Sequence, residues 1–382
     1  MLNLIAPINS TSYGKIGTYF VRELDAQGID FSLTPIGGIQ ATPDTIELIK
    51  KYHKDIRKPS FFSDAPSLKI WHQFDLCDSI GRGTKNGFTV FELDRLTERE
   101  QEHCKYLDHV ITSSMYHTKV LKQYGCNAHY VPLGVDRSIF NEKHNNKSDE
   151  TRFLYCGKIE IRKGIDKLVD IFKPLLDDNS NFKLFMMCYN PFLIKMDEVG
   201  NIISDGNKEW ETYFRGEFGD KLVWLPRLNS DQEVAEIFAN TDCLIAPSRS
   251  EGFGLPILEM LSMGKWVITG NNTAMGDFSA NAFILPDGNF DPNTMVLTGD
   301  SLRVIMPSVA KEQAFDEPFF KGQGNWFELS DSTIKEYQKK VFLLHRLKQS
   351  GTIPTNRNGI DLSKNLSWKN TLLKTLDIIL ER

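Results

Sequence analysis

Two glutamates eight positions apart frame a turn that could hold a ligand bearing phosphate and hydroxyl groups. Glu251 follows the apolar run Cys243 to Pro247, and Glu259 lies in the helical stretch that comes next. Between them, Gly252 and Gly254 would let the backbone approach a ligand closely, and the helix start would turn free N–H groups and a positive dipole end towards an anion. Carboxylates accept hydrogen bonds from sugar hydroxyls. Taken singly, Glu251 also suits a helix cap, and Glu259 a solvated or paired helix position.

A basic segment follows the apolar run Arg152 to Cys156. It contains Lys158, Arg162 and Lys163 and ends at Gly164. Cations at the N-terminus of a helix oppose its dipole, so an anion is needed to justify them. The segment therefore predicts a second part of an anion site. The alternative is a solvated basic turn.

The N-terminal half offers two further candidates. Gly14 and Gly17 lie in the small-residue loop that starts at Asn9, between the first expected strand and its helix, where open α/β sheets place ligands. The loop lacks the G-x-G-x-x-G spacing of a nicotinamide site, and its alternative is an ordinary flexible turn. His72 ends the expected strand Leu68 to His72, where it would face a cleft and could contact a ligand, or serve as a structural histidine.

The elements that carry these residues follow from the hydrophobic pattern, in which short apolar runs alternate with longer amphipathic stretches. This pattern indicates β-α-β units around parallel sheets, and hence an α/β fold. Strands are expected at Leu2 to Pro7, Phe31 to Pro35, Leu68 to His72, Phe88 to Glu92, His109 to Ser113, His129 to Pro132, Arg152 to Cys156, Phe182 to Cys188, Leu222 to Leu225, Cys243 to Pro247, Trp266 to Thr269 and Phe283 to Leu285.

The expected strands fall into two sheets, separated by the polar segment Asn141 to Glu150. We take this segment as a linker between an N-terminal domain over 1–145 and a C-terminal domain over 150–350. Helices are expected over Ser332 to Gln349 and Trp368 to Glu381. The C-terminal helical region, 360–382, could pack back on the N-terminal domain.

Composition limits the class of protein. The 382 residues are 41% hydrophobic and 25% charged, with no apolar run long enough to cross a bilayer. The first apolar stretch is too short for a signal peptide and lacks a basic start, so we expect a cytoplasmic protein. The six cysteines are scattered, which favours reduced thiols over disulfides or a zinc site. A formal charge of -5 gives no whole-protein attraction to nucleic acid or anionic lipid.

The run from Glu251 to Glu259 resembles the E-x7-E motif of retaining glycosyltransferases of the GT-B fold, especially glycosyltransferase family 4. Further segments are similar to the family in the same order along the chain: Phe91 to Leu96, Asp108 to Ser114, Val131 to Phe140, Tyr155 to Gly164, Gly264 to Thr269, Thr273 to Asp277 and Leu366 to Trp368. The resemblance implies a GT-B fold, in which two Rossmann-like domains place parallel sheets facing each other across a cleft. It also implies that the N-terminal domain takes the acceptor and the C-terminal domain the donor.

The resemblance assigns roles to the acidic loop. Glu251 would hold hydroxyls of the donor sugar and would not need to act as a nucleophile. Glu259 would bind the nucleotide ribose. The backbone of Phe253, Gly254 and Leu255 would lie against the sugar and the diphosphate.

It also assigns roles to the basic segment. Lys163 matches the Lys that neutralises the donor diphosphate, whereas Lys158 stands where Arg is usual. A Lys offers a point charge in place of a bidentate fork, and Arg162 could compensate. Gly14 and Gly17 would reach towards the diphosphate and acceptor. The catalytic candidates are therefore Glu251, Lys163, Lys158 and His72, and the residues expected to bind the co-substrate are Glu259, Phe253, Gly254, Leu255, Gly14, Gly17 and Arg162.

The reaction that the resemblance implies is transfer of a hexosyl or pentosyl group, with retention, from a UDP- or GDP-type sugar to a hydroxyl acceptor. The nucleotide sugar is a co-substrate, and neither a further cofactor nor a metal is expected. The acceptor stays open among glycans, lipid-linked sugars, proteins, metabolites and the hydroxylated DNA bases of some bacteriophages, with peripheral membrane or DNA contact as options. The rival functions are a phosphorylase, a nucleotide-sugar epimerase and a non-catalytic nucleotide-sugar-binding protein.

Overall fold

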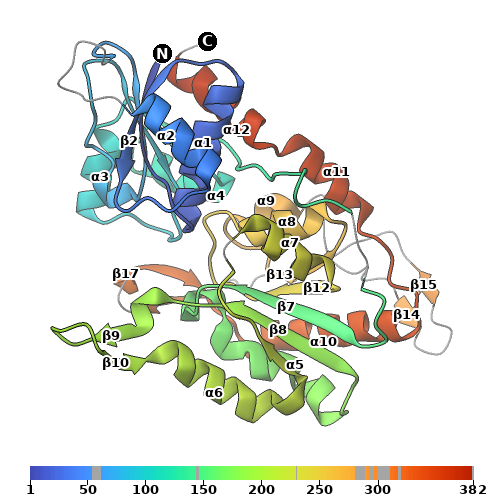
Figure 1. The fold of residues 1–382 in the computed structure, drawn as a ribbon. Helices are drawn as coiled ribbons and strands as arrows, with labels where there is room; N and C mark the ends of the chain where they lie inside the picture. Colours follow the sequence, from blue (N-terminus) through green and yellow to red (C-terminus); the bar gives the residue numbers. More distant parts are fainter. Residues whose placement is uncertain are drawn as a thin grey trace. The chain divides into compact units, whose positions relative to one another are not determined.

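The structure is a computed structural model that describes residues 1–53, 62–142, 146–228, 230–279, 289–291, 296–298, 310–316 and 320–380. It divides the chain into two compact units (Figure 1). The first contains Met1–Val135, Glu251–Phe253 and Asn365–Arg382, and the second contains Asp136–Ser250 and Gly254–Lys364. The first crossing between the units therefore falls after Val135, earlier than the expected boundary at residue 145.

A six-stranded parallel sheet forms the core of the first unit, in the order β2-β1-β3-β4-β5-β6. Its strands are Leu2–Pro7 (β1), Phe31–Ile36 (β2), Ser67–Ile70 (β3), Lys85–Thr89 (β4), His109–Thr112 (β5) and Ala128–Tyr130 (β6). Every residue of β1 is buried, as in a parallel sheet covered on both faces. The six strands expected here are confirmed, with ends that differ by up to three residues.

Helices surround this sheet. They are Ser12–Ala26 (α1), Pro43–Tyr52 (α2), Glu98–Lys105 (α3) and Met115–Gln123 (α4), with a 3-10 turn at Gln73–Asp75 (η1). Helix α1 begins after Thr11, whose side chain accepts the backbone N–H of Gly14. Ile16, Phe20 and Leu24 are buried at four-residue intervals, so they form the apolar stripe that packs on the sheet.

The last helix, α12 (Trp368–Ile379), packs on α1 of the first unit. The ring of Trp368 stacks on Tyr19, with centroids 4.5 Å apart. A Cβ added at Gly134 would overlap the backbone of Trp368, so only glycine fits where the chain passes this helix. The helix expected from Trp368 onwards is confirmed as far as Ile379.

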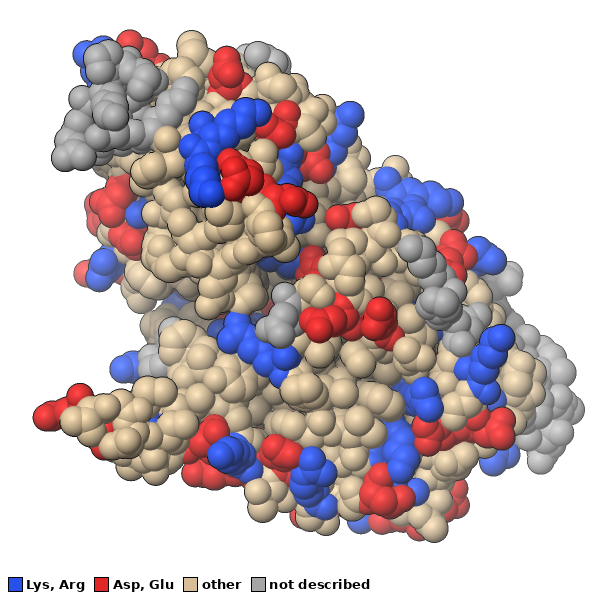
Figure 2. Space-filling view, in the orientation of Figure 1, with Lys and Arg blue, Asp and Glu red and all other residues tan. Residues whose placement is uncertain are grey.

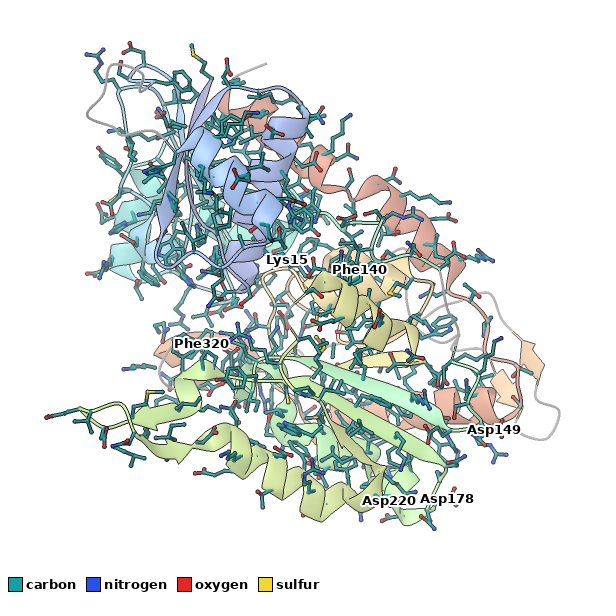
Figure 3. The ribbon with its side chains drawn as sticks, in the orientation of Figure 1. Lys15, Phe140, Asp149, Asp178, Asp220 and Phe320 are labelled. Atoms are coloured by element: carbon teal, nitrogen blue, oxygen red, sulfur yellow. The ribbon has the colours of Figure 1, made fainter. Side chains whose placement is uncertain are left out.

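A five-stranded parallel sheet forms the core of the second unit, in the order β11-β8-β7-β12-β13. Its strands are Thr151–Gly157 (β7), Phe182–Cys188 (β8), Leu222–Trp224 (β11), Cys243–Ala246 (β12) and Trp266–Thr269 (β13). These five strands are confirmed within one residue at each end. The expected strand Phe283 to Leu285 lies outside the described residues. In Figure 3, the labels of Asp149, Asp178 and Asp220 mark the amino end of this sheet.

The helices of the second unit are Leu168–Asp177 (α5), Gly206–Phe218 (α6), Asp231–Ala239 (α7), Leu255–Ser262 (α8), Met275–Ser279 (α9), Asp331–Gln349 (α10) and Arg357–Asn365 (α11). An aromatic cluster joins α5 to the sheet, because Phe172 lies 5.1 Å from Phe153 and 5.6 Å from Phe182 between ring centroids. The helix expected over Ser332 to Gln349 is confirmed as α10.

Sequence analysis missed three antiparallel hairpins, and it did not separate α11, most of which lies in the expected helical region 360–382, from the last helix. The hairpins pair Ile194–Met196 (β9) with Ile202–Asp205 (β10), Asn289–Asp291 (β14) with Val296–Thr298 (β15), and Lys311–Asp316 (β16) with Phe320–Phe327 (β17). Helix α11 lies in a stretch that reads as polar, and it buries only one side, including Gly359, Ile360 and Ser363. These elements are three to nine residues long, which is shorter than the window over which a periodic pattern can be recognised.

The described part of the expected linker packs on the second unit. Asn146 is buried and donates to Asp242 Oδ2 over 2.9 Å. Lys348 of α10 donates to the carbonyl oxygen of Asn146 over 2.8 Å and pairs with Asp242 over 3.1 Å. The polar composition of this segment therefore serves a buried hydrogen-bond network, which a linker would not need.

The surface carries charges of both signs. On the face drawn in Figure 2, Lys and Arg are interspersed with Asp and Glu. None of the six cysteines is in a disulfide. Among the described residues, no helix has the length and apolar composition that crossing a bilayer requires.

A buried histidine makes the stability of the first unit depend on pH. Burial lowers the pKa of His117 from 6.5 to about 3, and its Nδ1 lies 2.7 Å from Ser114 Oγ. Folded His117 stays neutral while the unfolded chain takes up a proton below pH 6.5, so stability falls as the pH drops from 6.5 towards 3. We expect His117 to lower the free energy of unfolding by about 2 kcal/mol at pH 5 relative to pH 8.

Urea unfolding at both pH values measures this effect, and the His117→Gln variant is the control because glutamine does not titrate. The variant should lose most of this pH-dependent difference. An equal pH dependence in the variant and the wild type would assign the effect to other groups.

Candidate active site

The strand order of the second unit defines where a ligand would bind. The chain runs from β7 outwards to β8 and β11, and then returns to the other side of β7 as β12. Open α/β sheets bind ligands at the carboxyl ends of the strands where the order reverses, which here are β7 and β12. The basic segment follows β7, and the glutamate loop follows β12. The two motifs found by sequence therefore leave the same edge of one sheet.

Gly164 allows the loop after β7 to pack closely against the loop after β12. It has φ 71, in the left-handed region, and a Cβ there would overlap the carbonyl oxygen of Pro247 at the end of β12. The 3-10 turn Ile161–Lys163 (η2) precedes it. At the other end of the turn, a Cβ at Gly157 would lie 4.0 Å from Lys163 Nζ. The Lys163 side chain therefore lies across the end of β7.

The three cations of the segment surround one buried carboxylate. Lys158 Nζ lies 2.5 Å from Glu160 Oε1, and Arg162 Nη2 donates to Glu160 Oε2 over 2.8 Å. Burial raises the pKa of Glu160, but Arg162, Lys158 and Lys163 outweigh it and lower the pKa to about 2. Glu160 is therefore ionised at neutral pH. With three cations against one carboxylate, the segment keeps an excess of positive charge.

Arg162 is oriented differently from the two lysines. Its side chain is 3% exposed, whereas that of Lys158 is 43% exposed. Arg162 Nη1 donates to the carbonyl oxygen of Ser250 over 2.7 Å, in addition to its bond with Glu160. The guanidinium thus ties the loop after β7 to the residue before Glu251. In this arrangement it holds protein groups, and Lys158 is the more accessible cation.

Arg249 is a buried residue of this region that sequence analysis missed. It pairs with Asp166 through Nη1 and Nη2, over 2.8 and 2.9 Å, and with Glu312 through Nε, over 2.6 Å. Its Nη1 also donates to the carbonyl oxygen of Ile161 over 2.6 Å. These partners lie 63 to 88 positions away in the chain, so no local pattern indicated them.

The glutamate loop leads into α8. Gly254 precedes the helix with φ 93, and its carbonyl oxygen accepts the N–H of Ile257 over 2.9 Å. Leu255 is the first residue of α8, and Glu259 is 4% exposed, which excludes the solvated alternative for Glu259. Asn272 donates to the carbonyl oxygens of Ser248 and Arg249 and so restrains the start of the loop.

Glu251 and Phe253 are buried, at 5% and 3% exposed. Their stretch, Glu251–Phe253, is counted with the first unit, whereas Ser250 and Gly254 on either side belong to the second. The hydrogen bonds of Arg162 and Asn272 fix the backbone on the Ser250 side, and the helix start fixes it on the Gly254 side.

In the first unit the strand order reverses between β1 and β3. Gly14 and Gly17 were expected in a loop, but they lie in the first turns of α1, on either side of Lys15 (Figure 3). A Cβ at Gly14 would overlap Asn9, and a Cβ at Gly17 would overlap the carbonyl oxygen of Pro7. Both glycines are therefore needed for the close packing of α1 on the loop after β1, whatever else they contact.

His72 follows β3 and lies in an aromatic stack. Its ring is 4.5 Å from that of Tyr13 and 5.3 Å from that of Phe74, between centroids. Tyr13 is buried, which raises the pKa of its hydroxyl, and it donates to the carbonyl oxygen of Val90 over 3.1 Å. The structure therefore brings His72 and the start of α1, with Tyr13 and Gly14, together at this sheet edge within the first unit.

Comparison with known proteins adds to this geometry. Residues 136–290 match the family model described as glycosyl transferases group 1. The O-antigen chain mannosyltransferase B of Escherichia coli is 25% identical over 227 residues, which cover 57% of this chain and 54% of that protein. The GDP-mannose-dependent alpha-(1-6)-phosphatidylinositol dimannoside mannosyltransferase of Mycobacterium tuberculosis (strain ATCC 25177 / H37Ra) is 22% identical over 153 residues, covering 38% of this chain and 36% of that protein. The chain thus matches about half of the first relative and about a third of the second.

Solved structures share the fold at low sequence identity. Sucrose-phosphate synthase from Thermosynechococcus elongatus aligns over 100% of this chain and 98% of its own, with a TM-score of 0.61 and 13% identity. Residues 136–290 are thus similar to glycosyl transferases group 1, and the chain as a whole has an α/β GT-B fold.

Proposed function

We propose that the protein transfers a mannosyl group, with retention, from GDP-mannose to a hydroxyl of a glycan. The observation that carries the proposal is the common sheet edge from which the basic turn Gly157–Gly164 and the glutamate loop before α8 both leave. The choice of mannose and of the guanine nucleotide is supported by the names of the two relatives described above.

In this proposal the basic turn binds the leaving diphosphate. Lys158 and Lys163 lie on a turn with excess positive charge, and negative charge grows on the diphosphate as the sugar becomes cationic in the transition state. Charges held in place before the reaction stabilise that state without reorganising. Arg162 keeps the turn in position through Ser250 and Glu160. Transfer would then need no added divalent metal, and activity in the presence of EDTA would test this.

The glutamate loop would hold the rest of the donor. Glu259, near the start of α8, would accept hydrogen bonds from the ribose hydroxyls, and Glu251 from those of the sugar. In the first unit, His72 and the start of α1 with Gly14 and Gly17 would take part in binding the acceptor. Proton NMR of the transferred sugar would show whether its anomeric configuration matches that of the donor.

A donor screen tests the proposed function. We expect GDP-mannose at about 100 times its Kd to stabilise the protein by about 2.7 kcal/mol and to raise Tm by about 5–10 °C. UDP-glucose, ADP-glucose and dTDP-glucose should give smaller shifts. Differential scanning fluorimetry measures the shifts, and release of GDP with and without a mannan acceptor measures turnover.

The outcomes separate the rival functions. If a donor with another nucleotide base raised Tm more than GDP-mannose does, that donor would replace GDP-mannose in the proposal. A shift with no turnover on any glycan would support a nucleotide-sugar-binding protein. Absence of a shift with every nucleotide and every sugar donor would refute the proposal as a whole.

A further inference from the structure

The hairpin β16–β17 packs against the proposed diphosphate-binding turn. Its strands pair antiparallel, with Glu312 opposite Trp326 and Asp316 opposite Phe320. The start of β17 lies at the carboxyl end of the second sheet, where Phe320 is labelled in Figure 3. Arg162 lies over the ring of Phe320, 5.8 Å from its centroid. The hairpin therefore approaches the turn from within the same unit.

Asp316, at the end of β16, caps the turn. Its Oδ2 accepts the backbone N–H of Ile161 over 2.5 Å and that of Arg162 over 3.4 Å. Burial raises the pKa of Asp316, and Glu160 adds to the increase, while the two backbone hydrogen bonds and Arg162 lower it. The N–H groups of the turn and the charge of Arg162 therefore favour the ionised form of Asp316 against its burial.

Arg249 contacts the other backbone group of Ile161, which is its carbonyl oxygen. It donates to the carbonyl oxygen of Ile161 over 2.6 Å, while Glu312 of the hairpin accepts from Arg249 Nε over 2.6 Å. Trp326 Nε1 donates to that same oxygen of Glu312 over 3.0 Å. The N–H and the C=O of Ile161 are thus both fixed by side chains from outside the turn.

The turn contains only one short element of regular structure. It is one 3-10 turn, Ile161–Lys163, between two glycines with positive φ, Gly157 and Gly164. A single turn is not stable by itself, and glycine adds backbone freedom that binding must remove. A turn held in its binding geometry beforehand reduces that loss and raises affinity.

We infer that the hairpin β16–β17 positions the diphosphate-binding turn, with Asp316 and Arg249 as positioning residues for glycosyl transfer. The inference rests on the proposed function, since the turn is taken to bind the donor diphosphate. Asp316 would act through the backbone of Ile161 and Arg162 without touching the donor, so its loss should change donor binding and turnover but not acceptor binding.

The test compares Asp316→Ala with Asp316→Asn. Asparagine keeps an oxygen that can accept the N–H of Ile161, whereas alanine leaves that N–H without its partner. We expect Asp316→Ala to raise KM for the donor and lower kcat, each by about 10-fold, as for loss of a hydrogen bond to a charged group. KM for the acceptor should stay at the wild-type value, and Asp316→Asn should recover most of both parameters. Phe315→Ala is the control on the same strand, because Phe315 is 61% exposed.

Calorimetry with GDP separates this inference from the proposed function. If wild type does not bind GDP or UDP, the proposed function and the inference fail together. If wild type and Asp316→Ala bind GDP equally, with equal KM for the donor, only the positioning inference is refuted. A loss in Asp316→Asn as large as in Asp316→Ala would also refute it, because the retained acceptor oxygen would then have no effect.

Discussion

Lys163→Ala is expected to lower kcat/KM for glycosyl transfer by about 100- to 1,000-fold, the usual effect of removing one group that stabilises transition-state charge. Lys163 lies across the end of β7 beside Gly157, on the turn that we propose binds the diphosphate. Its loss removes a fixed positive charge where the leaving group gains negative charge. Initial rates over a range of donor concentrations measure the effect.

The control for Lys163→Ala is Lys173→Ala, which removes the same charge from an exposed position on α5 of the same unit. That variant should retain wild-type kinetics. Lys163→Arg should recover part of the activity, because the charge returns with a different shape. Wild-type kcat/KM in Lys163→Ala, with GDP affinity unchanged, would remove Lys163 from the proposed site.

The sequence predicted those parts of the fold that depend on local patterns. Strands β8 and β13 were found to the residue, because their apolar runs are bounded by polar turns. The basic segment and the glutamate loop were also found, since their glycines and charges are close together in the chain. That both motifs leave one sheet edge became clear only from the strand order, which depends on pairing between distant strands.

The features that the sequence did not predict depend on contacts between residues far apart in the chain. Arg162 reads as a third cation for the diphosphate, but its guanidinium is held by Ser250 and Glu160. Arg249 and Asp316 carry no motif, and their partners lie far away in the sequence. The segment expected to be a linker is polar because its described part, including Asn146, joins a buried network. In each case the sequence gives the type of side chain but does not indicate which residue it contacts.

Glu251→Ala is expected to lower kcat/KM for the sugar donor by about 1,000-fold, while GDP affinity falls by less than about 3-fold. The reason is that GDP lacks the sugar whose hydroxyls Glu251 is proposed to hold, whereas the lysines of the basic turn would bind GDP and GDP-mannose alike. Glu251→Gln should lower kcat/KM by less, because the amide oxygen of glutamine still accepts hydrogen bonds. Rates with GDP-mannose and calorimetry with GDP measure the two effects on the same protein samples.

The control for Glu251 is Glu236→Ala, an exposed carboxylate on α7 of the second unit, which should leave both measurements unchanged. The comparison with Lys163→Ala is the sharper test, since that variant should weaken the binding of GDP and of GDP-mannose together. If Glu251→Ala weakened GDP as strongly as it weakened GDP-mannose, Glu251 would act on the loop or on the phosphates. Its proposed contact with the sugar would then be withdrawn, while the diphosphate site after β7 would still stand on the lysine result.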